Sequence, residues 1–205
     1  MLQTVALPAR VLPVTLRFGC AQKGSDDAFL AFCRANPDLR CERTAEGEII
    51  IVPPAGGESS HRSAKSIARL FNWAEVDGRG EAFDSSVMYM LPDGSSLSPD
   101  ASWVSHKSLR RLSREERREF LRLCPEFVVE VMSPSDRLRA TKQKMEQWIA
   151  NGCQLGWLID ADRETVYVYR PSKPVQMLQG IQELAGVGPV KGFVLPLRSI
   201  WAGLR

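Results

Sequence analysis

The chain has 205 residues, of which 44% are hydrophobic and 25% charged, with a formal net charge of +3. This length can fill one core well and is marginal for two, so we expect one domain over residues 25–205, preceded by an N-terminal extension over residues 1–24. The mildly positive charge permits a polyanionic partner without requiring one. No apolar run approaches the length of a membrane span, so we expect no membrane partner.

The cysteine and histidine content argues against a zinc site and against disulfides. The five cysteines are scattered, with no CxxC pair, and there are only two histidines. The N-terminal residues are broken by prolines and arginines and lack a small-residue cleavage site, so we do not expect a signal peptide. These observations predict a protein of the reducing cytoplasm.

The first half of the chain is expected to contain two helices separated by a hairpin. Ser25 and the acids after it start a helix over 26–36, and two strands follow around a turn at 45–47. The second helix spans 58–76. Its amphipathic pattern is carried by the apolar residues that recur at helical spacing, Ala64, Ile67, Ala68 and Phe71.

The second half alternates strands and helices. Strands are expected over 80–90, 101–105, 126–132, 155–160, 165–170 and 192–197, a charged surface helix over 113–123, and a helix over 138–151. This mixed order predicts an α/β or α+β fold with a central sheet flanked by helices. The aromatic-rich strand 165–170 fits either an exposed pairing face or the core.

Glu130 lies in the middle of a strand whose two faces are otherwise apolar. A strand of this kind is covered on both sides, so we expect Glu130 to be at least partly buried. An ionised carboxylate in such a place is unfavourable unless a cation or several hydrogen-bond donors meet it.

Asp100 opens the strand 101–105, after Pro99. If this strand pairs with the strand of Glu130, the two acids converge at one end of a sheet. Two nearby carboxylates repel each other unless a cation lies between them or one is protonated. Mg²⁺ suits a site with oxygen ligands and one or two carboxylates.

Lys144 lies at the edge of the apolar stripe of the helix that follows, one turn before Trp148. Its stem can lie over the sheet and bring the ammonium group to the acids. There it could hold an attacking water or stabilise a phosphorane-like transition state. Two simpler interpretations stay open: Asp100 as a turn residue, and Glu130 with Lys144 as a structural ion pair.

Three stretches, SPDASW, PEFVVEVMSPSD and KMEQWIANGCQLGWLID, resemble the PD-(D/E)XK nuclease superfamily, and within it the Uma-two family of restriction-endonuclease-like proteins. The likeness runs over nearly the whole chain. It implies a restriction-endonuclease-like core with a central mixed sheet. It also implies that Asp100 is the PD aspartate, Glu130 the acid of the second strand, and Lys144 the lysine, displaced from the position that Met132 occupies to the next helix.

The resemblance implies two further site residues and a partner. Glu42 matches an acid near the front of the family and is expected to be an additional or supporting carboxylate. Val131 is expected to offer its backbone carbonyl to the metal, Mg²⁺ or Mn²⁺. The substrate would be DNA. Nucleases of this architecture often act as homodimers, which the sequence neither requires nor excludes.

The leading hypothesis is therefore a Mg²⁺-dependent endonuclease that cuts DNA. One alternative is a module of the same fold that binds nucleic acid or oligomerises without catalysis. Another is a metal-dependent hydrolase of a different phosphoester, which would use the same residues.

Overall fold

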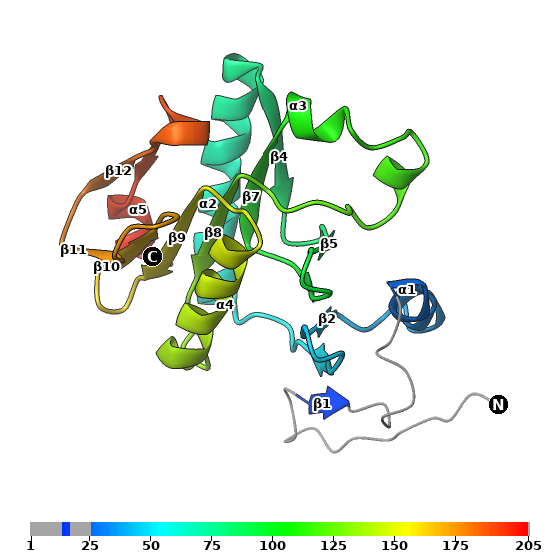
Figure 1. Cartoon of the computed structure of the whole chain (residues 1–205). Coiled ribbons are helices and arrows are strands. Elements are labelled where there is room, and N and C mark those ends of the chain that lie inside the picture. Colours follow the sequence, from blue (N-terminus) through cyan, green and yellow to red (C-terminus); the bar gives the residue numbers. More distant parts are fainter. Residues whose placement is uncertain (1–13, 17–25, 205) are drawn as a thin grey trace.

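The computed structural model describes residues 14–16 and 26–204. Within these residues a mixed six-stranded sheet forms the centre of the molecule, in the order β11-β10-β9-β8-β7-β4 (Figure 1). Strands β8 and β9 run parallel, and the other neighbours are antiparallel. The six strands are β4 (Gly80–Asp84), β7 (Ala101–Ser105), β8 (Phe127–Val131), β9 (Leu155–Asp160), β10 (Thr165–Tyr169) and β11 (Gln176–Gln179).

Two helices cover the two faces of this sheet. Helix α2 (Gly57–Asp77) packs on one face, and α4 (Leu138–Ala150) packs on the other (Figure 1). Alternate residues of β8 belong to different clusters: Phe127 and Val129 lie in the α2 cluster, and Val128 lies in the α4 cluster with Trp148. The predicted α/β (α+β) class, a central mixed sheet flanked by helices, is confirmed.

The buried face of α2 is not the one that its apolar residues predict. Ala64, Ala68 and Phe71 are exposed and Ile67 is half-buried. The residues that face the sheet are Ser59, Arg62, Ser66, Leu70 and Ala74. Most of these are small, which lets the helix lie close to the sheet. Ser66 Oγ donates to the Arg62 carbonyl, and the terminal nitrogens of Arg62 pair with Glu58 and Asp162. Ser59 Oγ and Arg62 Nε are buried without a hydrogen-bond partner among the described residues.

The prediction of a charged helix over 113–123 is wrong, because only one helical turn forms in this segment. Ser113 and Glu116 cap each other reciprocally, which starts the 3-10 helix η1 (Glu116–Arg118). Leu121 then forms a bridge with Tyr89, and its backbone exchanges hydrogen bonds with Met88 and Met90. This pairing with distant residues overrides the local helical preference.

A second sheet joins β1 (Val14–Leu16), β3 (Ile49–Ile51), β2 (Cys41–Arg43), β6 (Ser96–Leu97) and β5 (Tyr89–Met90), in that order, within the described part of the chain. Helix α1 (Asp26–Ala35) closes its core with Phe29. Residues 14–16, from the predicted extension, pair with β3. The rest of that extension, with the predicted cap Ser25, lies outside the described residues, and the domain division stays a prediction.

The last predicted strand forms but does not join the six-stranded sheet. Strand β13 (Val194–Pro196) pairs with β12 (Glu183–Ala185), and α5 (Arg198–Trp201) follows it. Phe193 and Leu195 pack into the α2 cluster. Strand β10 lies between β9 and β11 with all its residues buried, so the core explains its aromatic content.

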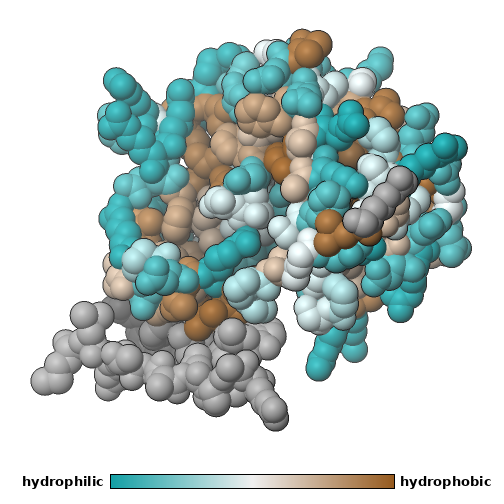
Figure 2. Space-filling view, turned by 180° about the vertical axis from the view of Figure 1, so that it is seen from behind, coloured by the Kyte–Doolittle hydropathy of each residue, from teal (hydrophilic) through white to brown (hydrophobic). Residues whose placement is uncertain are grey.

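None of the helices found in the described residues is both long and apolar enough to cross a bilayer. Seen from behind, hydrophilic side chains surround smaller patches of hydrophobic ones (Figure 2).

Candidate active site

The pairing of β7 with β8 brings the two predicted acids to one end of the sheet. Ala101 lies opposite Val129 in this antiparallel pair. Continuing the register by one residue sets Asp100 opposite Glu130, and residues opposite each other in a sheet project from the same face. The convergence expected from the sequence is therefore present in the backbone.

Glu130 is buried, with 7% of its surface exposed. Its Oε1 accepts a hydrogen bond from Trp148 Nε1 at 3.2 Å and lies 2.9 Å from Lys144 Nζ. Burial raises the pKa of Glu130 to about 7, because desolvation outweighs the attraction of Lys144, and the nearby Asp100 and Glu42 carboxylates raise it further. Glu130 is therefore much more easily protonated than an exposed glutamate.

Lys144 reaches the acids from α4, as its position in the sequence predicts. Its ammonium group contacts three oxygens: Oε1 of Glu130, Oε1 of Glu42 at 2.8 Å and the backbone carbonyl of Ser98 at 2.8 Å. Burial alone would lower the pKa of Lys144, but the Glu130 and Glu42 carboxylates outweigh it and raise the pKa above its ordinary value. Lys144 is therefore charged at neutral pH.

Glu42 comes from β2, in the second sheet, and joins the two sheets at this point. Its Oε1 accepts hydrogen bonds from Lys144 and, at 3.1 Å, from the backbone N–H of Ser98. Ser98 lies two residues before Asp100 in the segment that connects β6 to β7. The contact thus fixes the approach of the chain to Asp100 as well as the position of Lys144.

Asp100 is held by the neighbouring strand. Its Oδ2 accepts a hydrogen bond from the backbone N–H of Val131 at 2.7 Å, and the Ser63 side chain of α2 donates another. Burial raises the pKa of Asp100, and the Val131 N–H and the charge of Lys144 partly offset this rise. The backbone group of Val131 seen in contact with Asp100 is its N–H, and a role for its carbonyl stays a prediction.

Sequence reasoning missed three contributors to this site. Ser98 offers only backbone groups, which no side-chain pattern reveals. Trp148 was recognised as a core residue, and its position four residues after Lys144 is the signal that it also faces Glu130. Ser63 lies on α2, where the apolar pattern predicts a buried face made of other residues, from Ala64 to Phe71.

The carboxylate and carbonyl oxygens of this site are suitable ligands for a hard cation, although the acidic side chains do not form a ready metal-binding group. No three His, Cys, Asp or Glu side chains lie close enough together to hold a metal among residues 14–16 and 26–204. Two carboxylates and a carbonyl instead surround the Lys144 ammonium group. Carboxylate and carbonyl oxygens are also the ligands that Mg²⁺ takes, so the donor chemistry fits a divalent cation that would share Glu130 with Lys144.

The fold resembles that of a solved nuclease-like protein. A crystal structure of "a putative nuclease belonging to DUF820" from Anabaena variabilis matches with a TM-score of 0.69 and 24% identity, over 80% of this chain and 91% of that chain. At this identity the likeness establishes the fold alone. No curated protein matches the chain.

The family follows from the sequence itself. The Uma2 family model, described as "Putative restriction endonuclease", matches residues 26–198. The chain belongs to this family, and the resemblance drawn from its motifs is confirmed. The description of this family supports a nuclease as the class of protein.

Proposed function

We propose that the protein is a metal-dependent endonuclease that hydrolyses phosphodiester bonds in DNA. The observation that carries the proposal is the meeting of Asp100, Glu130 and Lys144 at one end of β7 and β8. A buried carboxylate with a raised pKa beside a charged lysine is typical of a functional site. The scattered cysteines, without a CxxC pair, support a location in the reducing cytoplasm.

Asp100 and Glu130, with the carbonyl of Val131, would hold Mg²⁺ or Mn²⁺. Such an ion polarises a scissile phosphate and lowers the pKa of the attacking water. Two fixed donors support these ligands: Trp148 Nε1–H orients Oε1 of Glu130, and the Val131 N–H orients Oδ2 of Asp100. A carboxylate has about four lone pairs, so each acid could bind the cation beside these hydrogen bonds.

Lys144 acts as a charged hydrogen-bond donor in this proposal. Because its pKa is raised, it does not take a proton from water near neutral pH. It holds the water and stabilises the negative charge that develops on the phosphate oxygens. Glu42 accepts a hydrogen bond from Lys144 at 2.8 Å and keeps the ammonium group at the mouth of the site.

The proposal predicts that the purified protein nicks supercoiled DNA with Mg²⁺ or Mn²⁺ and stops when EDTA is added. Asp100→Asn removes one charged ligand, so it should abolish nicking, whereas Asp38→Asn, at an exposed position, should leave it unchanged. Agarose-gel conversion of plasmid measures both. Equal activity in the two variants would contradict the site assignment, and the non-catalytic module would then be the better account.

The products of this assay also distinguish between the possible substrates and between a monomer and a homodimer. Linear product formed in one encounter would support a homodimer with two sites, because both strands are then cut together. Hydrolysis of a small phosphoester without any cutting of DNA would favour the other class of hydrolase.

Metal affinity should depend on pH through Glu130. Its pKa is raised to about 7, so below pH 7 a metal ion must displace a proton, and above it the carboxylate is already ionised. We expect the Mn²⁺ affinity to fall by about tenfold for each pH unit below 7 and to level off above it. Calorimetric titration between pH 5.5 and 8.5 measures this, and a flat profile would contradict a role for Glu130 as ligand.

A further inference from the structure

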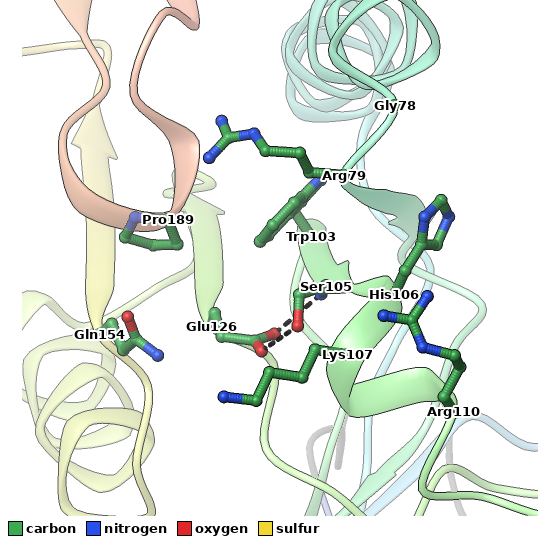
Figure 3. Close-up of a pocket in the computed structure, with 10 residues that line it drawn as sticks. All are labelled: Gly78, Arg79, Trp103, Ser105, His106, Lys107, Arg110, Glu126, Gln154 and Pro189. Carbon is green, nitrogen blue, oxygen red and sulfur yellow. Dashed lines mark hydrogen bonds between the residues drawn. The ribbon is translucent and has the colours of Figure 1, made fainter.

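A pocket of about 490 Å³ lies at the other end of β7 and β8 (Figure 3). Its lining residues are Gly78, Arg79, Trp103, Ser105, His106, Lys107, Arg110, Glu126, Gln154 and Pro189. Ser105 ends β7, whereas Asp100 precedes its first residue. At about 3.3 Å per residue, the pocket is about 16 Å from the candidate active site. It is therefore a separate site.

The charges around this pocket favour an anion. Lys107 and Arg110, on α3 (His106–Leu109) and just after it, are exposed and have no side-chain partner within the described residues. Arg79, which pairs with Asp77, adds a third cation. The carboxylate in the lining, Glu126, is already satisfied: its oxygens accept hydrogen bonds from Ser105 N–H, Ser105 Oγ and Ser108 Oγ.

The remaining wall combines apolar surface with hydrogen-bonding groups. Trp103 and Pro189 supply apolar surface, and the side chains of Gln154 and Lys107 extend into the same space (Figure 3). His106 points away from it and pairs with Glu81 at 2.9 Å. Trp103 Nε1 is buried and has no hydrogen-bond partner among residues 26–204, which is rare for a buried donor.

We propose that this pocket binds a nucleotide. The phosphate would pair with Lys107 and Arg110, the base would lie against Pro189 and Trp103, and the Gln154 amide would hydrogen-bond to the edge of the base. The volume lies in the range of small-molecule sites, about 300–1,000 Å³. Lysine and arginine are the usual ligands of phosphate. A free mononucleotide and the terminal nucleotide of a nucleic-acid strand share this chemistry.

Calorimetric titration of the full chain with adenosine 5′-monophosphate, in EDTA and without metal, tests the proposal. We expect saturable binding at one site, weaker binding of inorganic phosphate and of adenosine, and a loss of roughly tenfold or more in affinity for Lys107→Ala combined with Arg110→Ala. Arg69→Ala removes one charge from the exposed face of α2 and should bind as wild type. All substitutions are at exposed positions, and circular dichroism checks that the variants are folded.

Two results would overturn the proposal: no saturable binding of adenosine 5′-monophosphate, or equal affinity in the double variant and Arg69→Ala. Loss of binding in Lys144→Ala alone, which removes the cation of the candidate active site, would assign the nucleotide to that site and would overturn the proposal as well. A comparison of 5′-phosphorylated and unphosphorylated oligonucleotides distinguishes a strand end from a free nucleotide. This titration contains no metal ion, whereas nicking of DNA requires one. A failure to bind the nucleotide would therefore leave the nuclease proposal untouched.

Discussion

Lys144→Ala is expected to reduce metal-dependent nicking of DNA by about 10²–10³-fold, the effect of removing one donor aimed at transition-state charge. The substitution deletes the only side-chain cation that contacts Glu42 and Glu130 in the described residues. Initial rates of plasmid nicking at saturating Mg²⁺ measure the loss.

Lys142→Ala is the matched control for this experiment. Lys142 lies two residues earlier on the same helix, and its Nζ lies 4.1 Å from the ring centroid of Tyr167 rather than near the acids. Both variants lose one positive charge from α4, so a general electrostatic contribution to DNA binding would slow both. A similar rate for the two variants would exclude a specific role of Lys144.

Lys144→Met is expected to destabilise the metal-free protein by about 3–5 kcal/mol at pH 8. This is the usual effect of removing one partner of a buried ion pair, because the other charge is left buried and uncompensated. Glu130, with 9% of its side chain exposed, would then be a buried carboxyl group with Trp148 as its only side-chain donor among the described residues. Urea denaturation measures the change in the free energy of unfolding.

The pH dependence and a second substitution make this prediction specific. The pKa of Glu130 is raised in the folded state, so the folded protein binds this proton more tightly than the unfolded chain. The destabilisation should therefore be smaller at pH 5.5, where Glu130 is protonated. Adding Glu130→Gln should recover most of the loss at pH 8, and no recovery would show that Lys144 stabilises the fold by packing alone.

The site was predictable because its residues break local patterns. Glu130 interrupts an apolar strand, and Asp100 precedes a strand that brings the two acids together if it pairs with that of Glu130. Once these strands are adjacent, the position of Lys144 on the next helix follows from chain connectivity. Glu42 was reached only through the family resemblance, since it comes from a different sheet and its spacing to the other residues carries no information.

Other features were decided by contacts between distant segments. The sequence 113–123 has the composition of a helix, but the pairing of Leu121 with Tyr89 takes its backbone hydrogen bonds. On α2, close packing selects the small residues Ser59 and Ser66 over Phe71, which is 46% exposed. Such choices depend on the shape of the opposing surface, which a single sequence does not reveal.

In the proposed site, Asp100 and Glu130 share a divalent cation. A crystal of the protein soaked with Mn²⁺ and measured for anomalous scattering tests it most directly. We expect an anomalous peak between the two carboxylates, with Lys144 displaced from Oε1 of Glu130. The Asp100→Asn variant should show no peak there. Lys144 still bound to Glu130 and Glu42 with no peak between the acids, at a concentration of Mn²⁺ that supports cleavage, would contradict it.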